Sequence, residues 1–576
     1  MVKRLKNTKK KGIIVLLHYN MSHRVRIRVR GQIQKYHMGN IQMTKRDYFN
    51  LKNGSDIRGI ATEGVEGQFV NLTEEAVENI AKSFCVWLIS HTGKTTVRVA
   101  VGYDSRISSP ALCEAAVRGI TSTGHHALVT GLSTTPSMFM LLQNKNMQEE
   151  NPCHGSIMIT ASHLPSNRNG MKFFFHNGGL ESVHIDEILT WAPGYRFAEP
   201  GTPGNREEMS YLETYANDLV QIVRDATGEE TPLAGKKIIV DAGNGAGGFY
   251  AHKVLAPLGA NTAGSQFLDP DGTFPNHIPN PENKEAMQSV CNAVKATKAD
   301  FGIIFDTDVD RAGAVDCDGT EINRNRLIAL IAAILLEEKP GTIVTDSVTS
   351  NGLTKFITQR GGRHHRFKRG YKNVINEAIR LNNKGEYTPL AIETSGHAAL
   401  KENYFLDDGA FLMTRILIAL AKCSKEGKKL TDLIADLEMP KEEKEVRLRF
   451  VDGCDFKKMG AKILKDYEQH VKDMHYIEAA PDNYEGCRAN YDWKHGDGWT
   501  LVRMSLHEPI LPINMESDSF FGVLKMLKDL YYFLKDYSCL DVTPLREAIE
   551  SERERLINLI KTRYRANPQW LYFLFY

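Results

Sequence analysis

The sequence contains no long apolar segment and no cysteine motif. Its longest apolar runs, at 327–336 and 570–576, are far shorter than the roughly 20 residues that a membrane-spanning helix needs. Its nine cysteines are scattered, odd in number and never spaced C-x-x-C. These absences argue against a membrane protein, a structural zinc site and a disulfide-bonded secreted domain. We expect reduced thiols in a compartment outside the secretory pathway.

Acidic residues are absent from the first 46 positions, which contain 13 lysines and arginines. Because the whole chain has a formal net charge of +2, the other 530 residues carry a net −11, which disfavours general binding to nucleic acid. The basic leader is rich in Arg and poor in acid like an organelle transit segment, but it is not rich in Ser. A nucleic-acid-binding arm and a mis-assigned start codon are the alternatives. We expect a location in the cytoplasm or, if the leader is a transit segment, in a plastid.

Strands and helices alternate through most of the chain. The length of 576 residues exceeds what one core supports, so several domains are expected. Helices are predicted at 73–88 and 110–123, with strands at 97–101 and 127–130 between and after them. This order predicts βαβ units with parallel pairing. Further short buried strands are predicted at 156–159, 237–240, 301–305, 342–345 and 389–392.

Stretches of low helix and strand propensity divide the chain. We expect a basic extension over 1–50, α/β domains over 51–205, 206–325 and 326–440, and a last domain over 441–576. In that last domain, strands at 445–450 and 499–504 enclose a helix at 456–471, which is typical of an α+β domain. A charged helix is predicted at 543–565.

The first chemical motif is Thr160-Ala161-Ser162-His163-Leu164-Pro165, directly after the strand at 156–159. Ligands of open parallel sheets bind at the carboxyl ends of strands. Ser162 is therefore a candidate nucleophile, with His163 beside it and Lys172 ten residues on as a cation for a phosphate. Taken alone, such a hexapeptide is more often a turn whose side chains satisfy backbone groups.

The second motif is the D-x-D-x-D run of Asp306, Asp308 and Asp310, directly after the strand at 301–305. Three carboxylates within five residues repel one another unless a hard cation such as Mg²⁺ or Ca²⁺ lies among them. An EF-hand is excluded because Arg311 stands where its loop needs Gly. A solvated acidic turn is the remaining alternative. Magnesium commonly completes its shell with phosphate or water, and a phosphate on Ser162 would suit it.

Weaker signals lie at other strand ends. Glu393-Thr394-Ser395-Gly396-His397 offers acceptors and an imidazole suited to sugar hydroxyls, although a buried, hydrogen-bonded His is as common. Taken singly, four cations near glycines or strand ends are more often surface charges than phosphate ligands: Arg58, Arg106, Lys368 and Arg503.

In their order along the chain, these motifs resemble those of the α-D-phosphohexomutase family, which includes phosphoglucomutase and phosphomannomutase. The resemblance covers about residues 50–510. It rests on Asp56-Ile57-Arg58-Gly59, Thr160 to Pro165 with Asn169-Gly170-Met171-Lys172, Pro270-Asp271-Gly272-Thr273-Phe274-Pro275-Asn276, Asp306-x-Asp308-x-Asp310-Arg311, Lys368-x-Gly370 and Glu393-x-Ser395-Gly396-His397.

The resemblance implies an α/β protein: three similar α/β domains with mixed sheets, and a smaller α+β C-terminal domain, around a central cleft. Ser162 would carry a phosphoryl group and, with Asp306, Asp308 and Asp310, hold Mg²⁺. The implied catalytic residues are Ser162, His163, Lys172, Arg58 and Arg311. The implied substrate-binding residues are Lys368, Glu393, Ser395, His397, Arg503 and Ser505.

The implied activity is interconversion of hexose 1-phosphate and hexose 6-phosphate, of glucose or mannose, through a hexose 1,6-bisphosphate. We expect a monomer or dimer with no nucleic-acid or membrane partner. The sequence departs from the family pattern at Leu164, at Thr307 and in the loop 503–509. There Leu506 and His507 replace small residues, so His507 is expected to aid phosphate binding only when protonated. The alternatives are a catalytically weak paralogue that binds sugar phosphate in a regulatory role, and a Mg²⁺ phosphatase.

Overall fold

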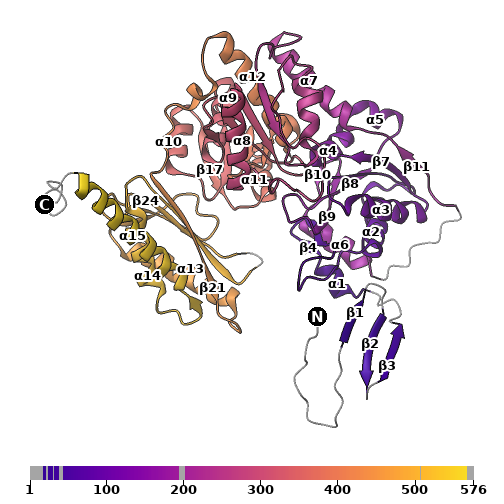
Figure 1. Cartoon of the computed structure of the whole chain (residues 1–576), viewed down its shortest axis with the longest axis horizontal. Coiled ribbons are helices and arrows are strands. Elements are labelled where there is room, and N and C mark those ends of the chain that lie inside the picture. The colour runs from indigo at the N-terminus through magenta and orange to yellow at the C-terminus, as the bar shows by residue number, and fades with distance from the viewer. Residues whose placement is uncertain are drawn as a thin grey trace.

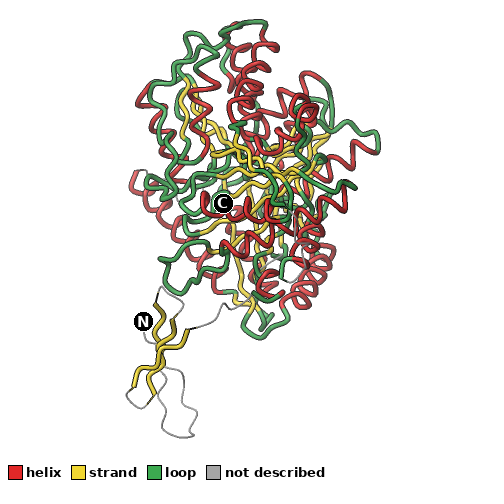
Figure 2. The backbone as a smooth tube through the Cα atoms, turned by 90° about the vertical axis from the view of Figure 1, so that its right-hand side faces the viewer, coloured by secondary structure: helices red, strands yellow, loops and turns green. Residues whose placement is uncertain are grey.

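The computed structural model of the chain describes residues 17–20, 24–29, 32–37, 43–193, 202–505 and 508–566. Figure 1 shows the body running from the indigo first sheet to the yellow C-terminal part, which lies to one side. Seen from the side, strands run through the middle of the body and helices lie outside them (Figure 2). Near the N-terminus, a separate antiparallel sheet is made of β1 (Leu17–Asn20), β2 (Arg24–Val29) and β3 (Gln32–His37).

The first sheet of the body is mixed. Its order is β11-β7-β6-β8-β9-β5-β4, with β10 paired to β9. The strands are β4 (Lys52–Asn53), β5 (Asp56–Ile60), β6 (Arg98–Tyr103), β7 (His126–Leu132), β8 (Gly155–Ile159), β9 (Arg168–Phe175), β10 (Gly178–Gly179) and β11 (Arg206–Glu208). The helices are α1 (Lys45–Phe49), α2 (Glu74–Thr92), α3 (Ser109–Ser122), α4 (Thr135–Gln143), α5 (Lys145–Glu150) and α6 (Ser182–Trp191).

Local signals explain the predicted elements of this sheet. The Thr73 side chain caps α2 by accepting from the Ala76 N–H, and Gly93 ends the helix at a φ of 67°. The strands predicted at 97–101, 127–130 and 156–159 are confirmed as β6, β7 and β8. The first domain was expected to end at 205, but its sheet includes β11, which begins at Arg206. β11 pairs in parallel with β7, next to a hydrogen bond from the Ala127 N–H to the Asn205 carbonyl.

The second and third sheets are also mixed. The second has the order β12 (Ile238–Asp241), β13 (Phe301–Phe305), β14 (Ala312–Asp316), β15 (Glu321–Ile322), with α7 (Leu212–Thr227), η1 (Ala246–Gly248), the π-helix η2 (Tyr250–Leu255) and α8 (Lys284–Thr297). The third has the order β17 (Arg363–Phe367), β16 (Thr342–Asp346), β18 (Leu390–Ile392), β19 (Ala398–Leu400), β20 (Leu406–Asp407). Its helices are α9 (Asn325–Glu338), α10 (Asn351–Gln359), α11 (Tyr371–Asn383), η3 (Lys401–Asn403), α12 (Gly409–Lys425) and η4 (Leu430–Ile434).

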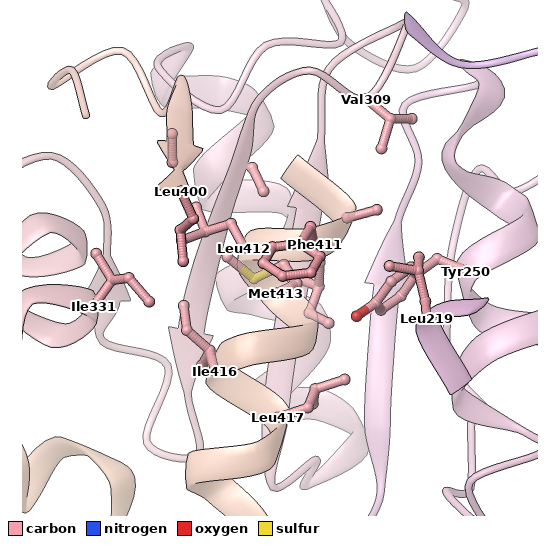
Figure 3. Packing of buried hydrophobic residues seen from close by; sticks show 14 of the residues in the cluster. Leu219, Tyr250, Val309, Ile331, Leu400, Phe411, Leu412, Met413, Ile416 and Leu417 are labelled. Atoms are coloured by element: carbon pink, nitrogen blue, oxygen red, sulfur yellow. The ribbon is translucent and has the colours of Figure 1, made fainter. Parts of the chain in front are cut away.

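Helix α12 joins the second and third sheets through one shared core. It is apolar almost all round, as a fully buried helix must be, and packs against α7, α9, β14 and β19. Figure 3 shows Phe411 of α12 between Tyr250, on the right, and Ile331, on the left. The Tyr250 hydroxyl also bonds to Thr414 Oγ1 at 2.9 Å. The two sheets are therefore held in a fixed relation.

The C-terminal part confirms the predicted α+β architecture. Its antiparallel sheet has the order β22 (Ile477–Ala479), β23 (Cys487–Tyr491), β24 (Gly498–Val502), β25 (Ile510–Ser517), β21 (Glu442–Phe450), β26 (Leu540–Asp541). The helices are α13 (Phe456–Asp473), α14 (Gly522–Leu534) and α15 (Thr543–Ala566). Buried and exposed residues alternate along β21, so Val446, Leu448 and Phe450 face the core. Within the parts of the chain that the structure describes, no helix is both long and apolar enough to cross a bilayer.

Candidate functional site: a serine facing three carboxylates

The three aspartates form a compact buried group in the loop between β13 and β14. One ligand oxygen from each of Asp306, Asp308 and Asp310 lies within 4.8 Å of the others. The loop bends sharply between them, and Val309 takes a φ of 65°, a left-handed conformation that is strained for a β-branched residue. Surrounding contacts hold this bend, including a hydrogen bond of 3.0 Å from the Gly409 N–H to the Val309 carbonyl.

The carboxylate group fits a hard divalent cation. Asp308 Oδ1 and Asp310 Oδ1 are buried and have no hydrogen-bond partner, although buried acceptors are normally paired. The other oxygens are engaged: Thr135 Oγ1 donates to Asp308 Oδ2 at 2.5 Å, and the Lys172 ammonium contacts both Asp308 and Asp310. Two buried oxygens thus remain available as ligands, and oxygen is the ligand that Mg²⁺ prefers.

Ser162 lies against this group from the carboxyl end of β8. Its Oγ donates to Asp306 Oδ2 at 2.9 Å and accepts from the Arg311 guanidinium at 3.1 Å. Its backbone has a φ of 50°, a conformation that few residues other than glycine adopt. Such strain persists only where the surroundings impose it, and it aims the hydroxyl out of the strand toward the aspartates.

Arg106 holds the conformation of the loop that carries Ser162. Its buried guanidinium donates to four backbone carbonyls of that loop, those of Ser162, Leu164, Pro165 and Arg168. Asp104 balances its charge and also accepts from Thr160 Oγ1 at 2.7 Å. Arg106 is therefore not the surface charge that such an arginine usually is, because it is buried among four loop carbonyls that accept from it.

Two more predicted residues lie near the serine. His163 Nδ1 is 3.3 Å from Ser162 Oγ. Burial, with Arg311, His397 and Arg58 nearby, lowers the pKa of His163 to about 2, so its imidazole stays neutral. Arg58 donates to the Thr160 carbonyl at 2.6 Å and to Asp56 at 2.8 Å.

Lys172 is held as a cation. Burial alone would lower its pKa, but Asp308 and Asp310 raise that pKa well above the usual value. It therefore supplies positive charge beside the three carboxylates.

The predicted sugar-binding loop meets the same group from the third sheet. His397 Nε2 is 3.7 Å from Asp310 Oδ1, and its Nδ1 is 2.9 Å from Ser395 Oγ. Its ring stacks on Tyr371, with centroids 5.4 Å apart. Glu393 Oε1 accepts from the Gly370 N–H at 2.6 Å. A cavity beside the loop of the three aspartates is lined by residues of all three α/β units, including Asp56, Lys172, Asp310, Tyr371 and Asp407.

The remaining predicted residues lie on loops of the third sheet and of the C-terminal sheet. Lys368 is exposed just after β17, with its ammonium 5.9 Å from the Phe367 ring centre. Arg503 follows β24, and Ser505 Oγ accepts from the Glu508 N–H at 3.3 Å. Leu506 and His507, on which the predicted pH effect depends, lie outside the described residues.

Sequence reasoning missed several residues that build this site. Asp104 and Thr135 follow β6 and β7 just as Ser162 follows β8, so position after a buried strand was an available signal. Tyr371 was signalled only by its place directly after the Lys368-x-Gly370 motif. Its hydroxyl lies 3.0 Å from Ser55 Oγ, which joins the third sheet to the first.

The arrangement defines a class of protein. A hydroxyl at a strand end lies beside three carboxylates that fit a divalent cation, and Arg311 and Lys172 add positive charge. This combination is typical of enzymes that transfer phosphoryl groups. Three consecutive α/β units and an antiparallel C-terminal sheet carry it, which confirms the expected fold class.

Comparison with known proteins identifies the family. The family models described as "Phosphoglucomutase/phosphomannomutase, alpha/beta/alpha domain I", "domain II" and "domain III" match residues 50–192, 211–319 and 323–439. The chain therefore belongs to the phosphoglucomutase/phosphomannomutase family, a family of isomerases. The resemblance seen in the sequence motifs is confirmed.

Individual relatives match over most of their length. The chain is 30% identical over 469 residues to a phosphoglucomutase of Neisseria meningitidis, covering 81% of this chain and 92% of that protein. It is 31% identical over 468 residues to a phosphoglucomutase/phosphomannomutase of Thermococcus kodakarensis, covering 80% and 93%. The crystal structure of a phosphoglucomutase/phosphomannomutase family protein from Burkholderia thailandensis matches with a TM-score of 0.69 at 27% identity, covering 86% of this chain and 98% of that one.

Proposed function

We propose that the protein is a Mg²⁺-dependent phosphohexomutase that interconverts hexose 1-phosphates and hexose 6-phosphates, with glucose or mannose as the sugar. A hexose 1,6-bisphosphate is the intermediate between the two transfers. The observation that carries the proposal is the Ser162 hydroxyl, which lies between Asp306 and the Arg311 guanidinium in a strained turn. Relatives named phosphoglucomutase and phosphomannomutase support the choice of substrate.

Phosphoryl transfer depends on positioning and charge neutralisation more than on covalent chemistry by the protein. Asp306, Asp308 and Asp310, with the phosphate on Ser162, would hold Mg²⁺. Once bound there, the ion would supply positive charge that offsets the charge of the transferring phosphoryl group. Lys172 adds a fixed positive charge from the protein side.

The two transfers balance. In the first, the bond between phosphorus and Ser162 Oγ breaks while a sugar hydroxyl oxygen bonds to phosphorus, and the hydroxyl proton replaces the phosphoryl group on the serine side. Arg311, which donates to Ser162 Oγ, stabilises charge on that oxygen as it leaves. In the second transfer the phosphate at the other end of the sugar returns to Ser162 by the reverse exchange.

The other predicted residues keep their proposed roles. Glu393, Ser395 and His397 bind the sugar, and His397 also lies 3.7 Å from Asp310. Lys368, Arg503 and Ser505 bind the phosphate that is not being transferred. Arg58 and His163 act in catalysis beside the serine, where Arg58 donates to the Thr160 carbonyl and His163 lies against Ser162 Oγ. The domains are proposed as 51–205, 206–325, 326–440 and 441–576.

Substitution of the serine tests the proposal. Ser162→Ala removes one hydroxyl and no core volume, so we expect the fold to persist and the conversion of glucose 1-phosphate to glucose 6-phosphate to disappear. Ser166→Ala is the matched control, because Ser166 is exposed in the same loop. Full activity in the control and none in Ser162→Ala supports the proposal. Near-normal turnover by Ser162→Ala excludes Ser162 as the phosphoryl carrier.

A further inference from the structure

A carboxylate from the C-terminal sheet ties that sheet to the third one. Glu485 lies in the turn before β23 and reaches two donors of the third sheet's loops. Its Oε2 accepts from Ser347 Oγ at 2.6 Å and from the Arg369 N–H at 2.9 Å. Its Oε1 lies 3.5 Å from the guanidinium of Arg503, the proposed phosphate ligand. One carboxylate thus engages a hydroxyl, a backbone N–H and an arginine.

The hairpin register places Glu485 beside Arg503. Cys487 of β23 pairs with Val502 of β24, so Gly486 comes opposite Arg503. Gly486 has a φ of 69°, and a Cβ there would lie 2.2 Å from the Val502 carbonyl oxygen. Only glycine tolerates both conditions, so the backbone fixes the carboxylate next to the arginine.

The donors that hold Glu485 are those that bind phosphate. Hydroxyl, backbone N–H and guanidinium groups make charge-assisted bonds to carboxylate and phosphate oxygens alike. Arg503 is also not saturated, because its Nε is buried without a hydrogen-bond partner. A guanidinium can bind a second anion, but the two anions repel each other, so the first one weakens the binding of the second.

We propose that Glu485 is an internal counter-anion that competes with the substrate's phosphate for Arg503 and so sets the affinity for phosphosugars. In the unliganded protein Glu485 neutralises Arg503 and ties the C-terminal sheet to Ser347 and Arg369. When the non-transferring phosphate binds, Arg503 exchanges the carboxylate for the phosphate. This inference rests on the proposed function, since it takes Arg503 as a phosphate ligand.

The test is the affinity for glucose 6-phosphate, measured by titration calorimetry in the Ser162→Ala background so that no phosphoryl transfer occurs. Glu485→Gln keeps an acceptor for Ser347 and Arg369 but removes the charge. We expect it to lower the Kd about five- to tenfold, the lower part of the usual range for coupling between sites. The matched control is Glu478→Gln, an exposed residue on β22 of the same sheet that loses the same charge; it should leave the Kd unchanged.

A merely structural tie would give the opposite result, because loosening it would leave the Kd unchanged or raise it. Either outcome for Glu485→Gln overturns the proposal. Ser347→Ala provides a second route, since it removes a donor that holds Glu485 without changing the charge at Arg503; it should also lower the Kd. If the Ser162→Ala parent itself binds no hexose phosphate, the proposed function fails instead, independently of Glu485.

Discussion

Replacing Arg106 by lysine should disorder the serine loop and remove most of the activity. The guanidinium of Arg106 donates to the carbonyls of Ser162, Leu164, Pro165 and Arg168 and to the Asp104 carboxylate. Lysine keeps the charge, but its ammonium has three donors on one nitrogen. At least two of these five side-chain hydrogen bonds are therefore lost.

The magnitude follows from burial. A hydrogen bond from a charged group contributes about 1.5–3 kcal/mol, so losing two of them destabilises the ordered loop by about 3–6 kcal/mol. A displacement of about 1 Å at reacting groups can lower the rate about 100-fold. We therefore expect Arg106→Lys to lower kcat about 100-fold or more. The affinity for the sugar phosphate should change little, since Arg106 is buried and does not line the cavity beside the aspartates.

The assay is steady-state kinetics with hydrogen exchange of the serine loop. Arg118→Lys is the control, because Arg118 lies on α3 of the same domain and its ion pairs with Glu74 and Glu78 are exposed. Arg106→Lys should exchange faster at 162–168, and Arg118→Lys should behave as the wild type. A kcat within about threefold of wild type for Arg106→Lys would refute the reasoning that this guanidinium positions the nucleophile.

Three further substitutions probe other parts of the site. Asp308→Asn should lose most of the Mg²⁺-dependent activity, and a magnesium titration that is unchanged from wild type would count against the metal site. Gly272→Ala should lower the melting temperature and the activity, since a Cβ would lie 2.3 Å from the Ile107 backbone nitrogen and such overpacking costs about 1–3 kcal/mol; an unaltered melting temperature contradicts this contact. Tyr371→Phe keeps the ring stack but loses the hydroxyl beside Ser55, so kcat should fall modestly without loss of fold, and a wild-type kcat would show that the hydroxyl does not help close the site.

The strand ends of this protein were readable from the sequence. Buried runs such as 301–305 stop at polar residues because the ligand-binding edge of an α/β sheet lies there. That pattern located Ser162 and Asp306 separately, each on its own sheet. Only the family resemblance, carried by the order of the motifs, predicted that the two residues meet. The structure adds the contact itself, 2.9 Å between Ser162 Oγ and Asp306 Oδ2.

Contacts between sheets could not be read in this way. In the sequence Arg106 looks like a surface arginine, because the residues next to it give no sign of the four carbonyls, 56 to 62 residues away, that accept from it. Thr135 bonds to Asp308, 173 residues away, and Glu485 bonds to Ser347, 138 residues away. Such pairings depend on how whole domains pack, which local propensity does not encode.

The most direct test of the account is the covalent state of Ser162. The purified full-length protein should contain a fraction with one phosphate, located on Ser162 by peptide mass spectrometry, and brief incubation with hexose 6-phosphate and Mg²⁺ should move that phosphate to the sugar as the bisphosphate. The same treatment of Ser162→Ala should yield neither species. A protein that interconverts hexose phosphates while Ser162 never carries phosphate would contradict the account.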